Sequence, residues 1–213
     1  MSEVTEFLPG LMLAFGVFMV GIASPGPNVL AVIGTSMAVG RRCGGALALG
    51  VAFGSLTWAT LTVLGLSALL ATYAHALLVL KIVGGLYLLW LAYKSFRAAA
   101  RYTDIDAQAL AGGTRSPAGY AMRGYAIQMT NPKAALTWIA IVSLGLGQGA
   151  PVWVGVALVL GTFFLSALFH LLYALAFSTP LMVRVYGRAR RWIQATLGVV
   201  FAFAGLRLLT ARV

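Results

Sequence analysis

Charged side chains are scarce in this chain, and acidic ones are scarcer still. Of its 213 residues, 9% are charged and only four are Asp or Glu, whereas 61% are hydrophobic. Soluble domains carry about a quarter charged residues, and a soluble fold has no way to hide this much apolar side chain. The composition therefore predicts an integral membrane protein.

Cysteine and metal-ligating side chains are also few, which excludes several kinds of chemistry. The lone Cys43 allows neither an internal disulfide nor a CxxC pair, and transmembrane thiol carriers need two cysteines. Intramembrane metalloproteases need a ligand set such as HExxH, and the two histidines here are far apart with no matching acid. We therefore predict a protein that is not an enzyme and has no cofactor or metal site. A membrane redox or enzyme component, and a metal-ion exporter with only His170 as an intramembrane ligand, are the alternatives.

Six apolar segments are long enough to cross a hydrocarbon core of ~30 Å as helices that rise about 1.5 Å per residue. They are too continuous to be barrel strands, which alternate over ~10 residues. The first segment follows Glu3 and Glu6 rather than a basic region, so we expect it to be retained and not cleaved as a signal peptide. The expected fold class is all-α, with six transmembrane helices over approximately 7–39, 44–71, 77–98, 120–146, 152–178 and 192–210.

The basic residues gather in loops that would lie at one face of the membrane. By the positive-inside rule this asymmetry makes the odd-numbered loops cytoplasmic and places both termini outside. The net charge of +11 is then an orientation signal, with some attraction for anionic lipid. We expect the lipid bilayer and no nucleic acid as the partner, because the charges belong to separate membrane-edge loops. Eleven basic residues stand against three: Arg41, Arg42, Lys94, Arg97, Arg101, Arg115, Arg123, Arg184, Arg188, Arg190 and Arg191 against Lys81, Arg207 and Arg212.

A faint internal repeat divides the chain into two halves. When the sequence is shifted by 105 residues, Pro27 falls on Pro132 and three glycines fall on glycines. Three spans per half is an odd number, so the second half enters the membrane from the opposite face and the repeat is inverted, as in secondary transporters. We expect one transmembrane domain: repeat 1 over about 7–98, a cytoplasmic linker over about 99–119, and repeat 2 over about 120–210.

In each half, the first helix is interrupted at the matched position. The interruptions are Pro25-Gly26-Pro27-Asn28 and Asn131-Pro132-Lys133. A proline inside a helix costs about 3 kcal/mol, and freed backbone groups cannot face lipid, so both breaks must face protein or a water-filled cavity. Each break also exposes a helix N-terminus, which attracts anions such as a carboxylate.

Lys133 is the charged residue of the second break. It lies ten residues after Arg123, so it is ~15 Å into the core and near the midplane, where inverted-repeat transporters bind their substrates. An intramembrane charge is a candidate functional residue, and this lysine is too deep to snorkel to a surface comfortably. The alternative is that the prolines only kink helices for packing.

Three segments share their motifs and spacing with a known family. They are "SPGPNVL" (24–30), "KIVGGLYLLWLAYKSFRAA" (81–99) and "RGYAIQMTNPKAAL" (123–136). In these segments the chain resembles the lysine exporter family, often called LysE/RhtB, of bacterial amino-acid exporters. The resemblance implies six helices and export of small amino acids across the bacterial inner membrane, coupled to the proton gradient. The family's motif positions fall on Pro25, Gly26, Pro27, Asn28, Asn131, Pro132 and Lys133.

One departure from the family pattern bears on proton coupling. Many members resemble Gly-Asp where this chain has Gly54-Ser55, and no Asp or Glu lies in any predicted span. The usual carboxylate proton carrier of transporters is therefore missing. His170 is the candidate that takes its place, because histidine can carry a proton near neutral pH. The alternative is a histidine that is only hydrogen-bonded between helices.

The site residues predict a secondary-active transporter of small neutral amino acids or their derivatives, and the resemblance implies that it exports them from the cytoplasm. The substrate carboxylate would sit on the helix N-termini at 27–28 and 132–133, with Lys133 adding charge. The substrate ammonium would take unwound backbone carbonyls together with Asn28, Asn131 or Gln128. A cationic substrate is disfavoured, because the spans hold no carboxylate. A homodimer is left open.

The second segment supplies two further predictions. Gly50 and Gly54 form a GxxxG pattern, for which close helix packing is the expected role. Ser55 shares a helix face with Trp58 and Thr62 and is the candidate from this segment for the cavity wall. The alternative for Ser55 is a hydrogen bond across helices.

Overall fold

The regular secondary structure of the chain is helical. The structure, a computed structural model, describes residues 3–24, 26–72, 76–100, 113–146 and 149–210. The all-α class is confirmed for these residues, which form α1 (Glu3–Ala23), α2 (Pro27–Ala38), α3 (Arg41–Thr72), α4 (Ala76–Ala100), α6 (Pro117–Met129), α7 (Pro132–Gly145), α8 (Val152–Ala176) and α9 (Pro180–Thr210).

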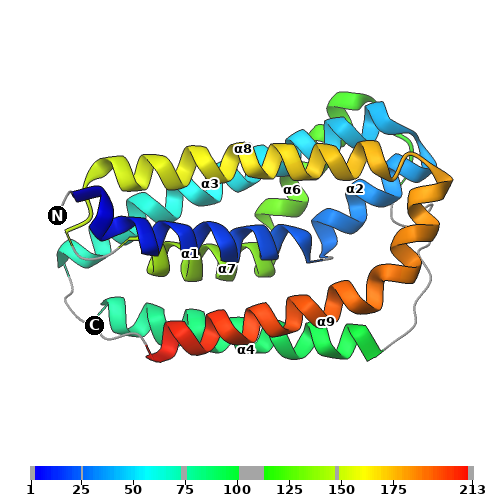
Figure 1. Cartoon of the computed structure of the whole chain (residues 1–213). Helices are drawn as coiled ribbons and strands as arrows, with labels where there is room; N and C mark the ends of the chain where they lie inside the picture. Colours follow the sequence, from blue (N-terminus) through cyan, green and yellow to red (C-terminus); the bar gives the residue numbers. More distant parts are fainter. Residues whose placement is uncertain (1–2, 25, 73–75, 101–112, 147–148, 211–213) are drawn as a thin grey trace.

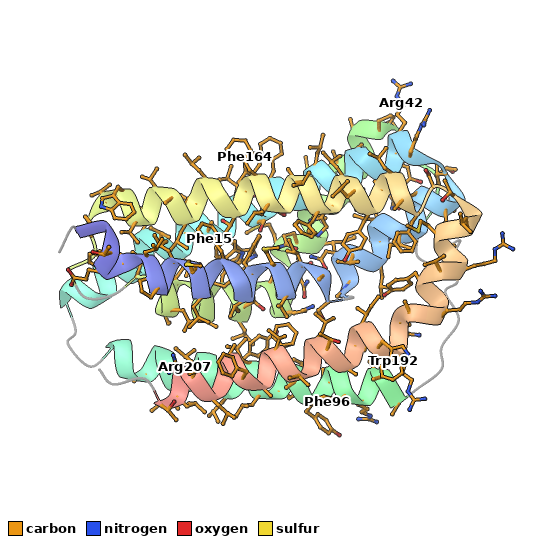
Figure 2. All side chains as sticks on the ribbon, in the orientation of Figure 1. Phe15, Arg42, Phe96, Phe164, Trp192 and Arg207 are labelled. Carbon is orange, nitrogen blue, oxygen red and sulfur yellow. The ribbon has the colours of Figure 1, made fainter. Side chains whose placement is uncertain are left out.

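Four stretches within these helices are long and apolar enough, by length and composition, to cross a membrane. They are Thr5–Ala23, Arg41–Gly65, Val152–Ala176 and Arg184–Thr210. Two shorter apolar helices cover Pro27–Ala38 and Lys133–Gly145. Large apolar side chains such as Phe96 and Phe164 point outward from the helices, which fits a lipid environment (Figure 2).

The first and fourth expected segments are each two helices. The helix α1 ends at Ala23 and α2 begins at Pro27, while α6 ends at Met129 and α7 begins at Pro132. Both second halves start with proline, whose missing N–H costs nothing in the first turn of a helix. Pro25, which belongs to the predicted first break, lies outside the described residues.

One predicted boundary is wrong. The last helix begins at Pro180 rather than near Trp192. Four arginines interrupt the apolar residues before Trp192, so hydropathy alone places the start of the helix too late in the chain. Proline at the first helical position was the available start signal.

Helices from the two halves of the chain pack against each other. Figure 1 shows α4 and α9 side by side along one edge of the molecule, with the other helices gathered in a larger bundle beside them. Within that bundle α3 lies along α6 and α8, and α1 lies along α7. The first break, in half one, is thereby brought next to the second break, in half two.

Small residues set two of these close pairings. A Cβ on Gly50 would overlap the carbonyl oxygen of Ala121, and one on Gly54 would lie 2.8 Å from the Cβ of Gln128. These contacts bear out the close packing expected for the GxxxG pattern, and they fix the end of α6 against α3. On the other side, a Cβ on Gly205 would lie 2.9 Å from the carbonyl oxygen of Gly85, which brings α9 against α4.

Candidate functional site

Two adjoining cavities lie at the breaks. The smaller, which we call the break cavity, has an empty volume of about 350 Å³, and its polar lining is Asn28, Gln128, Asn131, Lys133 and Thr137. The larger, which we call the vestibule, has an empty volume of about 920 Å³ and lies between the breaks and the α4–α9 pair. Gly26, Pro27, Asn131 and Lys133 line the vestibule. Asn131 and Lys133 therefore belong to both cavities.

Lys133 joins the second break to the first. It lies in the first turn of α7, and its Nζ donates to the carbonyl oxygens of Ser24 (3.0 Å) and Gly21 (3.3 Å) at the end of α1. A lysine ammonium is favourable there, because the last carbonyls of a helix lack partners and carry partial negative charge.

The same ammonium also lies beside the start of α2. A Cβ placed on Gly26, the N-cap residue of α2, would be 3.4 Å from Nζ of Lys133. The positive end of α2 and the positive charge of Lys133 thus point at the same place. Both features attract an anion.

The amides of Asn28 and Gln128 form the second link between the breaks. Asn28 Nδ2 donates to Gln128 Oε1 at 3.0 Å, and the two residues are 8% and 5% exposed. The backbone carbonyl of Gln128, near the end of α6, accepts the indole N–H of Trp58 at 3.2 Å. Side chains therefore satisfy polar groups that the break in α6–α7 frees, as an apolar environment requires.

Asn131 has a local role in addition to lining the cavities. Its side-chain oxygen accepts the backbone N–H of Lys133 at 3.0 Å and so caps α7. Asparagine is a favoured N-cap because its oxygen satisfies one of the donors that a helix start leaves without a partner.

Two tyrosines that hold the breaks were missed from the sequence. The hydroxyl of Tyr87 on α4 donates to the carbonyl of Lys133 at 3.2 Å, and that of Tyr173 on α8 donates to the carbonyl of Ala23 at 3.4 Å. A tyrosine in the middle of an apolar helix was the available signal, because a buried phenol needs a hydrogen-bond partner.

Ser55 and His170 lie apart from this cluster of polar side chains. Ser55 is buried on α3 but lines neither cavity. His170 is 1% exposed on α8, where its Nδ1 lies 2.8 Å from the carbonyl oxygen of Ser166. Its Nε2 is buried without a hydrogen-bond partner among the described residues. The role of each residue in transport stays a prediction.

The lining of the two cavities favours one kind of ligand. Amides, hydroxyls and ammonium groups line them, and no carboxylate does so within the described part of the chain. In the same part of the chain, no group of three His, Cys, Asp or Glu side chains lies together in a way that could hold a metal ion. The arrangement can bind a solute that carries a carboxylate, with carbonyl oxygens nearby for a positively charged group.

Comparisons with known proteins identify the family of the chain. Residues 19–212 match the family described as LysE type translocator. The chain is 33% identical over 213 residues to the threonine efflux protein of Salmonella typhi, which covers 95% of this chain and 100% of that protein. It is 32% identical over 211 residues to the uncharacterized membrane protein YahN of Escherichia coli (strain K12), which covers 98% and 93%.

A leucine efflux protein of Enterobacter sp. (strain 638) is 31% identical over 133 residues, which are 61% of this chain and 62% of that protein. No solved structure matches the chain. The match over most of the sequence confirms the resemblance seen in the motifs: this chain belongs to the LysE type translocator family of membrane transporters.

Proposed function

We propose that this chain is a secondary-active transporter that exports a small neutral amino acid from the bacterial cytoplasm across the inner membrane. The names of its relatives, threonine and leucine efflux proteins, support amino-acid export. The observation that carries the proposal for the site is the position of the Lys133 ammonium. It lies between the carbonyl end of α1 and the start of α2, at the wall of two adjoining cavities.

The substrate carboxylate binds at the N-terminus of α2, beside Lys133. Two of the three protons on the Nζ ammonium are donated to Gly21 and Ser24, which leaves one N–H donor for an anion. Charge-assisted hydrogen bonds of this type are about twice as strong as neutral ones.

The substrate ammonium needs acceptors, and the breaks supply them. The carbonyls at the end of α1 and the side-chain oxygens of Asn28, Gln128 and Asn131 lie around the break cavity. A substrate with a second positive charge would meet Lys133 without a compensating carboxylate in the described lining. Neutral amino acids are therefore preferred to cationic ones.

The topology is six spans in two inverted repeats. Each repeat has three spans, and the first span of each consists of two helices. The spans of repeat 1 are α1 with α2, α3, and α4; those of repeat 2 are α6 with α7, α8, and α9. The distribution of charge supports this arrangement: the α2–α3 turn, the end of α4 and the start of α9, which together hold most of the basic residues, lie at one end of the bundle (Figure 1). Arg42 marks that end, and Arg207, one of the basic residues elsewhere, lies toward the opposite end (Figure 2). The basic end faces the cytoplasm and both termini face outward.

His170 carries the proton that couples transport to the proton gradient. Its Nε2 is the buried imidazole nitrogen that lacks a partner in the described structure, and Tyr173 on the next turn bonds to the end of α1. The ring of His170 lies 6.5 Å from the ring of Tyr173, so a proton on His170 would act on the first break through Tyr173. The alternative is that His170 has only a structural role. The effect of His170→Gln on transport driven by a pH gradient alone distinguishes the coupling role from the structural one.

The test of the function is transport of a panel of labelled amino acids in proteoliposomes. Threonine and leucine are expected to move faster than in empty liposomes, and Lys133→Ala is expected to lower kcat/KM at least about tenfold, the loss of about 1.4 kcal/mol of binding. Lys133→Arg, which keeps the charge, is the matched control and should retain more activity. No amino acid moving faster than in empty liposomes would contradict the proposed function.

A further inference from the structure

The vestibule holds a second lysine, Lys94, in addition to Lys133. Lys94 lies on α4, and its Nζ is 4.4 Å from the ring centre of Trp90, which lines the same vestibule. A cation over an indole face is attracted by the ring. This contact holds the ammonium at the vestibule wall.

A continuous line of contacts on α4 leads from Lys94 to Lys133. The ring of Trp90 lies 5.5 Å from the ring of Tyr87, and the hydroxyl of Tyr87 donates to the carbonyl of Lys133. Positions 87, 90 and 94 share one face of the helix, since they are three and four residues apart. Lys94 comes seven residues after Tyr87, which is about 10 Å along the helix axis. The two lysines therefore lie at different depths of one cavity.

Two neutral polar side chains line the vestibule together with Lys94. Ser95 of α4 and Gln194 of α9, both 4% exposed, line the vestibule with it. No acidic residue lines this cavity in the described part of the chain. A positive charge without a neighbouring carboxylate, in a cleft with apolar walls, raises the local concentration of anions.

We propose that Lys94, together with Ser95 and Gln194, forms a vestibule subsite that binds the carboxylate of the amino acid before it reaches Lys133. This inference rests on the proposed function. The face of Trp90 is available to the aliphatic part of the substrate. The subsite loads the vestibule from the basic end of the bundle, and the substrate then moves inward from one ammonium to the next.

The experiment is equilibrium exchange of labelled threonine in proteoliposomes with equal concentrations on both sides; leucine replaces threonine if threonine is not carried. Lys94→Gln is expected to raise the exchange KM about tenfold, while kcat at saturation stays within about twofold. Lys94→Arg, which keeps the charge, is expected to stay within about threefold of wild type. Arg97→Gln is the matched control, because Arg97 is an exposed cation on the same helix that does not line the vestibule.

Ionic strength separates a binding role from a structural one. Raising salt from about 50 to about 500 mM should raise KM in wild type and in Arg97→Gln, since the Debye length falls from about 14 to about 4 Å. It should raise the KM of Lys94→Gln less, because Lys133 is then the remaining lysine of the vestibule. A KM of Lys94→Gln within twofold of wild type, or an equal rise in Lys94→Arg, would overturn the subsite while leaving the proposed function intact. If wild type exchanges no amino acid of the labelled panel, the proposed function and the subsite fall together.

Discussion

The two breaks are matched in sequence but built differently. At the second break, α7 is capped by the side chain of Asn131, which accepts the N–H of Lys133. At the first break, the N-cap of α2 is Gly26, in extended backbone (φ −129°, ψ −179°), which has no side chain to cap the helix; Oδ1 of Asn28 instead accepts the N–H of Val29 in the first turn at 2.9 Å. A Cβ at Gly26 would lie 3.2 Å from Oδ1 of Asn28 and 3.4 Å from Nζ of Lys133.

The difference assigns separate tasks to the breaks. At the second break, the side chain of Asn131 caps α7, and the ammonium of Lys133 reaches the carbonyl of Ser24 at the first break. The first break has no side chain at its N-cap residue, so Gly26 leaves space beside Lys133, and the N–H of Val29 is the donor that Asn28 satisfies. In this account one break receives the substrate carboxylate and the other supplies the charge, so a single site is assembled from both halves.

The largest expected effect comes from separating the helices that hold the breaks together. Gly50→Leu would drive a side chain into the backbone of α6 at Ala121, and overpacking of this kind costs about 1–3 kcal/mol or more. We expect little folded protein, measured by size-exclusion chromatography in detergent. Gly16→Leu is the matched control, because a Cβ there has nothing within 4 Å. Equal yields of the two variants would contradict the close packing of α3 on α6.

The next effect comes from filling the space at the first break. Gly26→Val would place methyl groups against Asn28 and the ammonium of Lys133. We expect kcat/KM for transport to fall about tenfold or more while the protein stays folded, since displacing one charge-assisted hydrogen bond is worth about 1.5–3 kcal/mol. Wild-type transport by Gly26→Val would mean that the space beside Lys133 is not used.

At the second break a smaller effect on stability is expected. Asn131→Ala removes the cap of α7 and should lower the free energy of unfolding by about 1 kcal/mol. Asn131→Ser, which can also cap, should recover most of that loss. The measurement is the shift in apparent Tm of the purified variants in detergent. Equal Tm values for the alanine and serine variants would show that the cap contributes nothing.

The smallest effect concerns the end of α6. Trp58→Phe removes the indole N–H that reaches the carbonyl of Gln128 at 3.2 Å, and a net hydrogen bond is worth about 0.5–1.5 kcal/mol. We expect a correspondingly small fall in apparent Tm. Trp192→Phe is the control, because Trp192 is 75% exposed at the surface. The same Tm shift in both variants would remove any special role for Trp58.

Local features of this fold were predictable from the sequence. The helical class, the interruption at both Pro-containing motifs and the close packing at Gly50 and Gly54 follow from composition, proline chemistry and small-residue spacing. These are properties of a few neighbouring residues. The start of α9 escaped prediction, because four arginines interrupt the apolar residues before Trp192.

Contacts between distant segments were not predictable. Lys133 bonds to Ser24 and Gly21, more than a hundred positions away in the chain, and nothing local identifies the partners. The pairing of α4 with α9 likewise depends on how glycines of each helix make room for large side chains of the other, as Gly85 does for Leu209 and Gly198 for Phe96. Tyr87 therefore looked like a packing or interfacial aromatic, although it bonds to the second break.

The most direct test of a site assembled from both breaks is a double-mutant cycle on threonine binding. Equilibrium binding would be measured for purified wild type, Gly26→Ala, Lys133→Gln and the double variant in detergent. Because the methyl group of Gly26→Ala would lie 3.4 Å from Nζ of Lys133, the account predicts that the two losses of binding free energy fail to add by about 0.5 kcal/mol or more. Losses that add to within about 0.3 kcal/mol would contradict it, since the two breaks would then act on the ligand independently.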